Sequence, residues 1–208
     1  MTRIRISALA LLGATTFALL TQSGCAALVV GGAVGTAMVA SDRRSTGTQI
    51  EDESIELKAV TRIRETVGER GHVNVVSYNR MVLLTGEVPT EADRVAVEQA
   101  VARIENVRST VNDLVLSGNS SLTSRSNDTI LTSKVKASFV DARDMLSNAF
   151  KVTTERGTVY LMGRVTEREA TRAADLARSV SGVQKVVRVF EIVTEAELAD
   201  LQPKTPAK

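Results

Sequence analysis

The sequence predicts an α+β fold in which one α-β-β-α-β unit occurs twice in tandem. The apolar stretch 82–88, centred on Gly86, recurs 77 residues later as the stretch 159–165 around Gly163. An alternating apolar segment precedes each stretch, and a charged segment of helical period follows it. Because self-similarity at a fixed spacing is the signature of a repeated structural unit, we interpret the two regions as copies of one fold.

Each copy is expected to begin with a helix and continue into a β-hairpin. Apolar residues recur at every fourth position, at Ile55, Ala59, Ile63 and Val67 in the first copy and at Leu131, Val135 and Phe139 in the second. We expect Asp128 to be the N-cap of the second helix. Alternation over 73–78 and 150–155 predicts the first strand of each hairpin. Asn79-Arg80 and Arg156-Gly157 predict the two turns.

An amphipathic helix then follows each hairpin, over 91–104 and 167–180. Pro89 stands at a position that favours helix entry. Asn106 and Gly182 follow the two helices, and both residue types tolerate the left-handed conformation that ends many helices.

A last strand is predicted over 107–116 in the first copy and over 183–193 in the second. A helical crossover returns this strand parallel to the second one, with a right-handed connection. Each copy is therefore expected to be a three-stranded mixed sheet with two helices on one face. A unit of about 65 residues buries a marginal core alone, so we expect the two copies to pack together.

The first 24 residues have the features of a bacterial secretory signal. Arg3 and Arg5 form a basic region, and an apolar run over 6–20 follows it. The run ends close to Cys25, the only cysteine in the chain, which is typical of a lipoprotein whose cysteine is acylated. Gln22 stands where the usual lipoprotein signal has leucine, so a plain secreted protein and an uncleaved anchor over 6–40 are the alternatives.

The expected organisation follows from these boundaries. It comprises a lipoprotein signal peptide over 1–24, a lipid-anchored tether over 25–50, a first repeat over 51–116, a linker over 117–127, a second repeat over 128–193 and a C-terminal tail over 194–208. Ala26 follows the cysteine, and because this residue is not aspartate we expect placement in the outer membrane, facing the periplasm.

Composition argues against catalysis. The one histidine, His72, is expected to be solvated in a turn before a strand, and no His, Cys and carboxylate residues have metal-ligand spacing. No glycine-rich phosphate loop follows a predicted strand, and no histidine is placed to activate a serine. We therefore expect no enzyme activity, catalytic residue, metal, cofactor or small-molecule substrate. The Gly-x-x-Gly loop of an RNA-binding KH module is also absent, so no nucleic acid is expected.

Charge differs between the copies. Residues 51–116 hold 8 basic and 12 acidic side chains, whereas residues 117–193 hold 12 basic and 8 acidic ones. The basic copy is suited to contact an anionic surface, although the opposite charges of the two copies could also attract each other.

The first helix of the second copy carries a candidate contact residue. Ile130 lies about 100° away from the core stripe of this helix, near Lys134, Lys136 and Ala137. An apolar residue beside lysines is a small version of an interfacial membrane patch.

These features resemble the dual BON-domain outer-membrane lipoproteins of the DolP/YraP type. The matching stretches are Gly47–Gln49, Ser126–Thr129, Val152–Glu155 and Leu161–Ala170. The resemblance implies a non-enzymatic protein whose second BON domain binds anionic phospholipid through its first helix and which supports cell-envelope integrity. The implied contact residues are Asp128, Thr129, Ile130, Ser133, Lys134, Lys136, Ala137 and Val140. The family has an interfacial aromatic residue where this chain has Ile130.

Two other functions remain open at this stage. One is a protein-interaction adaptor that docks on an outer-membrane assembly or secretion component. The other is a periplasmic domain that binds peptidoglycan or a small molecule. Flotation with liposomes that contain or lack anionic lipid distinguishes the phospholipid reading from the adaptor reading.

We predict that Cys25 is the mature N-terminus and carries lipid, because no second cysteine exists to form a disulfide within the chain. Mass spectrometry of the N-terminal peptide from membrane-extracted protein should show an acylated cysteine. A free thiol at this position, or cleavage at another bond, would contradict the prediction.

Overall fold

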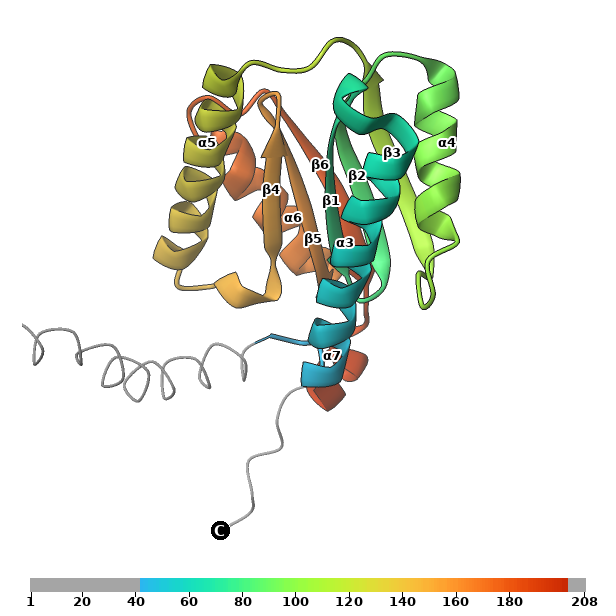
Figure 1. Ribbon diagram of the computed structural model, residues 1–208. Helices are drawn as coiled ribbons and strands as arrows, with labels where there is room; N and C mark the ends of the chain where they lie inside the picture. The colour runs from blue at the N-terminus through green and yellow to red at the C-terminus, as the bar shows by residue number, and fades with distance from the viewer. Residues whose placement is uncertain (1–41, 202–208) are drawn as a thin grey trace, which may run out of the picture. The chain divides into compact units, whose positions relative to one another are not determined.

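The computed structural model describes residues 42–201, and these residues belong to one compact unit (Figure 1). The predicted signal peptide, Cys25 and most of the predicted tether lie outside the described residues, as does the end of the predicted tail. Within the described part of the chain, no helix has the length and hydropathy needed to cross a bilayer.

Both repeats have the predicted α-β-β-α-β order. The first contains α3 (Thr46–Val67), β1 (His72–Tyr78), β2 (Met81–Val88), α4 (Glu91–Ala102) and β3 (Ser109–Leu116). The second contains α5 (Leu122–Asp141), β4 (Lys151–Glu155), β5 (Thr158–Val165), α6 (Glu167–Ser179) and β6 (Lys185–Ile192), followed by α7 (Glu195–Leu201). In each sheet the hairpin is antiparallel and the last strand pairs in parallel with the middle one. The predicted mixed sheets are therefore confirmed.

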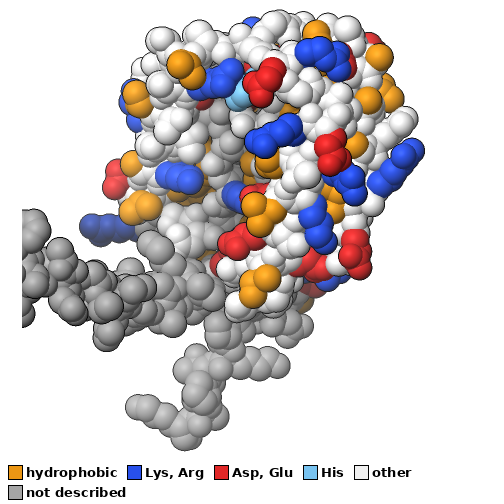
Figure 2. All heavy atoms as spheres, viewed as in Figure 1, with side chains coloured by type: hydrophobic (Ala, Val, Ile, Leu, Met, Phe, Trp, Pro, Cys, Tyr) orange, Lys and Arg blue, Asp and Glu red, His pale blue; other side chains and the backbone are white. Residues whose placement is uncertain are grey.

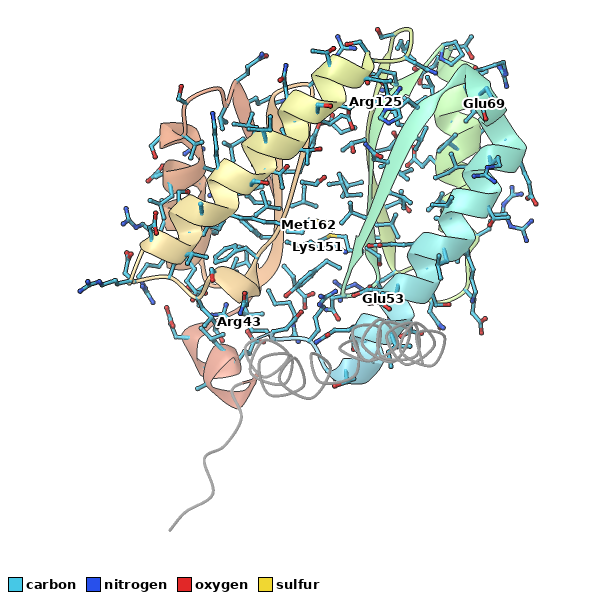
Figure 3. All side chains as sticks on the ribbon, turned by 60° about the vertical axis from the view of Figure 1, so that its left-hand side comes forward. Arg43, Glu53, Glu69, Arg125, Lys151 and Met162 are labelled. Atoms are coloured by element: carbon cyan, nitrogen blue, oxygen red, sulfur yellow. The ribbon has the colours of Figure 1, made fainter. Side chains whose placement is uncertain are left out.

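The two sheets pack face to face, with the helices of each repeat on the outside (Figure 1). Alternate residues of the middle strands point to opposite faces. Val82 and Leu84 join the core beneath α3 and α4, whereas Leu83 faces the other sheet. Tyr160 and Met162 meet it from the second repeat, and Figure 3 shows Met162 between the sheets. The expectation that the copies pack together is confirmed, and this packing buries the face that the helices leave uncovered.

The two hairpin turns are held in the same way. Both central residues of each turn have positive φ, at Asn79 and Arg80 in one repeat and at Arg156 and Gly157 in the other. This is the type I′ geometry that matches strand twist. A buried aspartate of the preceding helix accepts both turn amides, at 2.8 Å in the first repeat and at 2.8 and 2.9 Å in the second. These aspartates are Asp52 and Asp128.

The prediction that Asp128 is an N-cap is wrong. Helix α5 begins at Leu122, and Ser121 caps it by accepting a hydrogen bond from the amide of Ser124. The predicted linker 117–127 is correspondingly shortened, because its second half is helical. Likewise α3 begins at Thr46, inside the predicted tether. The first turns of α3 and α5 are mostly exposed to solvent and carry mainly polar side chains. Their sequence therefore resembles that of a linker.

Gly86 and Gly163 occupy equivalent sites, as the repeat predicted. A Cβ atom at either position would lie closer than 3.0 Å to a backbone carbonyl oxygen, that of His72 or that of Ala149. These two oxygens belong to residues at equivalent places, 77 positions apart, near the start of each hairpin. The strand before the turn therefore approaches the middle strand closely in both repeats, and only glycine leaves the space.

Residues 42–44 attach to both repeats. Arg43 donates two hydrogen bonds to the carboxylate of Glu169, at 2.7 and 2.8 Å, and one to the carbonyl oxygen of Arg164. Arg44 pairs with Asp52 at 2.8 Å and lies over the ring of Tyr78 at 4.2 Å. A soluble fragment should therefore begin at residue 41, because a later start would remove these contacts.

We predict that Gly86→Ala destabilises the fragment 41–208 by about 2–4 kcal/mol, because the new Cβ meets backbone and φ is positive. The free energy of unfolding from urea titration measures this loss. Gly118→Ala is the control, since nothing lies within 4 Å of its added Cβ. Equal stability of the two variants would contradict the proposed close approach.

We predict that Asp52 makes stability depend on pH. Burial alone would raise the pKa of Asp52, but hydrogen bonds from Ser77, Arg80, Arg44 and Asn79 outweigh it and hold this pKa below its usual value of 3.8. Because the pKa is lower in the folded state, the stabilisation is present above the unfolded pKa and is lost as pH falls through the folded one.

The comparison is between wild type and Asp52→Asn. At pH 7 the variant should be about 3 kcal/mol less stable, because the buried turn amides and Arg44 lose their charged partner. The difference should shrink below pH 4, as measured by urea titration across pH. A difference that stays constant would show that the charge of Asp52 is not the cause.

Candidate membrane-contacting site

Helix α5 has one buried and one exposed face. Leu131, Val135 and Phe139 are buried against the sheet of the second repeat, as predicted. On the opposite side Ile130 is 54% exposed and Val140 is 69% exposed. Neither side chain belongs to the buried core of the second repeat.

Seven of the eight predicted contact residues lie on the exposed side of α5. They are Thr129, Ile130, Ser133, Lys134, Lys136, Ala137 and Val140. Ile130 and Ala137 are two turns apart on one line of the helix, and Lys134 lies one turn after Ile130. Within the described residues neither Lys134 nor Lys136 forms an ion pair. The exposed face of α5 is therefore a weakly apolar stripe with two available ammonium groups.

Asp128 does not belong to this surface. Its side chain is buried and its two carboxylate oxygens accept the amides of Arg156 and Gly157. The prediction that Asp128 contacts a membrane is therefore wrong, because the hairpin turn already uses its carboxylate.

One further residue was missed by the sequence analysis. Leu122 is 78% exposed at the first turn of α5, two helical turns before Thr129 and on the side of Val140. It fell within the predicted linker, so its helical position was not apparent. It extends the apolar stripe along the helix.

An open groove runs beside the N-terminal half of α5. Its walls include Ser124, Asn127, Ile130 and Lys134 from the helix and Arg156 from the hairpin turn. Hydroxyl, amide and cationic groups thus lie next to an exposed isoleucine. This combination suits a group with anionic oxygens that is attached to an apolar chain.

Helix α5 is fixed on its sheet by polar contacts as well as by its core residues. The hydroxyl of Thr132 donates to that of Thr154 on β4 at 2.8 Å. Beyond the end of the helix, Asp144 accepts from Arg172 of α6 at 2.9 Å. Glu169, one turn before Arg172 on the same α6, binds Arg43. The C-terminal end of α5 therefore lies on the side of the molecule where the described chain begins.

A second group of titratable side chains lies at the junction of the repeats. His72 was expected to be solvated in a turn, but it is the first residue of β1 and its side chain is 18% exposed. Its Nδ1 lies 3.2 Å from a carboxylate oxygen of buried Glu87. Glu155 approaches from β4 and accepts a short hydrogen bond from Asn74. Burial, opposed by this bond, raises the pKa of Glu155. The expectation of a solvated histidine is wrong.

The sequence could not show this cluster. Its members come from positions 72, 87 and 155, so no short spacing links them. Only the pairing of β1 with β2 and the packing of one sheet on the other bring them together. Figure 2 shows the imidazole, in pale blue, among acidic and basic side chains.

Comparison with known proteins matches this architecture. The BON domain family matches residues 52–118 and 127–194. The chain is 41% identical over 184 residues to Outer membrane lipoprotein DolP of Haemophilus influenzae, covering 87% of this chain and 93% of that protein. It is 32% identical over 154 residues to the 21 kDa hemolysin of Actinobacillus pleuropneumoniae, covering 73% of this chain and 79% of that protein.

Among solved structures, CdsD, a structural protein of the type III secretion system of Chlamydia trachomatis, aligns with a TM-score of 0.28 and 10% identity. The alignment covers 71% of this chain and 99% of that one. Two complete BON repeats and the extended identity to DolP, together with the repeat fold described above, establish the family. The chain belongs to the BON-domain family as a dual-BON, DolP-like protein.

Proposed function

We propose that the second BON repeat binds anionic phospholipid through the exposed face of α5, and that the protein thereby supports the integrity of the cell envelope. The observation that carries this proposal is the apolar stripe of Ile130, Ala137 and Val140, which has no packing role and is flanked by Lys134 and Lys136. Apolar insertion combined with attraction to anionic headgroups is how helices lie in a membrane interface. We also infer that the protein acts by binding and not by catalysis.

The contact is expected to be weak by itself. Burying one isoleucine contributes roughly 1.5–3 kcal/mol, and each lysine near an anionic surface contributes about 1 kcal/mol. Together these give roughly 3.5–5 kcal/mol, which corresponds to a dissociation constant of about 0.2–3 mM. An outer-membrane anchor raises the effective concentration of the domain at the bilayer, so a weak contact is sufficient.

The position of α5 supports this arrangement. The chain enters the described unit at residues 42–44, near the end of α6 that faces the C-terminal end of α5. The 17 residues from Cys25 to Ser41 reach at most about 60 Å when fully extended. A helix on the entry side is therefore within reach of the bilayer that holds the anchor.

One observation favours a protein-docking function as the second candidate. Helix α3 of the acidic repeat also exposes apolar side chains, with Ile50 at 63%, Leu57 at 72% and Val60 at 48%. Acidic side chains lie beside them, including Glu53, so this face suits an anionic bilayer poorly. It fits an adaptor that docks on an outer-membrane assembly or secretion component through the first repeat.

We predict that Ile130→Glu abolishes binding of the fragment 41–208 to vesicles that contain anionic phospholipid, without lowering its melting temperature. The reason is that Ile130 is exposed and a carboxylate there is repelled by the headgroups. Vesicle flotation and thermal unfolding measure the two effects. Leu131→Glu should unfold the second repeat, because Leu131 is buried.

Leu57→Glu is the matched control. It places the same charge on an exposed apolar position of the equivalent helix in the first repeat, and flotation should not change. Binding that survives Ile130→Glu but is lost in Leu57→Glu would place the lipid contact on α3. Wild-type protein that does not float with anionic vesicles would favour the adaptor function.

A further inference from the structure

Three side chains with metal-binding atoms converge where the two repeats meet. His72 and Glu87 lie directly opposite each other in the ladder between β1 and β2. Glu155, the last residue of β4, joins them from the second repeat. One ligand atom of each side chain lies within 4.8 Å of the others. Two strands of one repeat and one strand of the other thus supply a single cluster.

The charges of this cluster are poorly balanced by the protein. Glu87 is fully buried, and its nearest cation is the half-exposed guanidinium of Arg156, at 3.5 Å. Glu155 is also buried, and the hydrogen bond to it comes from the neutral amide of Asn74. Asp52 shows the contrast, because Arg44 binds it at 2.8 Å. Two buried carboxylates close together favour a bound cation.

The geometry suits zinc. Zinc binds histidine nitrogen and carboxylate oxygen at about 2.0–2.2 Å, so two ligand atoms of a tetrahedral site lie roughly 3.3 Å apart. The distance from His72 Nδ1 to Glu87 Oε2 is 3.2 Å. The ligand oxygen of Glu155 lies within 4.8 Å of both atoms. A shift of at most about 1.5 Å would bring it to the separation of a tetrahedral site. Three protein ligands and a water would complete the coordination.

The surroundings supply outer contacts and a path for the ion. The amide of Ser120 donates to Glu87 at 3.2 Å, and Asn74 holds Glu155. Such contacts orient the ligands of a metal site. A solvent pocket of about 370 Å³ opens onto His72 and Glu155, with Arg125 at its edge. Figure 3 shows Arg125 near the N-terminal end of α5.

We propose that His72, Glu87 and Glu155 bind a zinc ion that links the two BON repeats. The ion neutralises the two buried carboxylates and joins β1 and β2 to β4 across the sheet–sheet interface. Imidazole and carboxylate ligands in a small tetrahedral set favour zinc over magnesium or calcium, which prefer more oxygen ligands. The proposal does not depend on phospholipid binding.

The test uses the fragment 41–208, which forms one compact unit and lacks Cys25, so no thiol competes for the metal. After treatment with a chelator, zinc at a hundredfold excess over its dissociation constant should raise the melting temperature by roughly 5–10 °C. Co²⁺ in place of zinc should show the intense visible absorption of a tetrahedral site. The glutamine variants His72→Gln and Glu155→Gln should each weaken zinc binding more than about tenfold in calorimetry.

The matched control is Glu191→Gln. Glu191 also joins the repeats, by accepting from Asn79 at 2.6 Å, but it lies outside the cluster, so zinc affinity should not change. Melting temperatures without metal show whether each variant is folded, and the Co²⁺ spectrum reports ligation independently of stability. The proposal is overturned if zinc leaves wild type unaffected, if the cobalt site is octahedral, or if His72→Gln and Glu155→Gln bind zinc as wild type does. Stabilisation by Cu²⁺ alone also overturns the assignment of zinc.

Discussion

The rest of the structure depends on the packing of one sheet against the other. Each repeat covers only one face of its sheet with helices, and the other face carries apolar side chains such as Leu83 and Met162 that must be removed from water. A second copy of the same unit supplies a complementary face. A polar contact also joins the two sheets, from the hydroxyl of Tyr160 to Asp113 at 2.7 Å. The two repeats therefore form one compact unit, and side chains of both repeats meet at the rim of their interface.

This constraint leaves the outer helices free to differ. The inner faces of α3 and α5 carry the same spacing of apolar residues, because both pack on the same kind of sheet. Their outer faces have no such requirement. Acidic side chains including Glu53 accompany Leu57 on α3, whereas lysines accompany Ile130 on α5. A duplicated fold has in this way produced two surfaces of different chemistry, with the basic one suited to anionic lipid.

Local patterns account for what the sequence could predict. Alternation around Gly86 and Gly163, helical spacing and the turn dipeptides each involve neighbours in the chain, so the strand order and both cores were accessible. The start of α5 was not, because Ser121 and the polar turn after it look like a linker until packing is known. Asp128 was predicted to cap a helix because aspartate is common at that position. Its true partners, the amides of the hairpin turn, lie 28 and 29 residues away in the sequence, so no local pattern could reveal them. His72 was missed for the same reason, because its neighbours come from another strand and another repeat.

The position of Glu155 connects the inter-repeat cluster to the outer surface of the second repeat. Its neighbours on both sides are held by α5, since the hydroxyl of Thr154 accepts from Thr132 and the amide of Arg156 donates to Asp128. A cation bound by Glu155 would therefore act on the strand end that carries α5. The inter-repeat cluster and the exposed face of α5 are therefore connected through one short segment, residues 154–156. This connection runs through the buried side of α5, by way of the Thr132 hydroxyl and the Asp128 carboxylate, and leaves the exposed face of the helix unchanged.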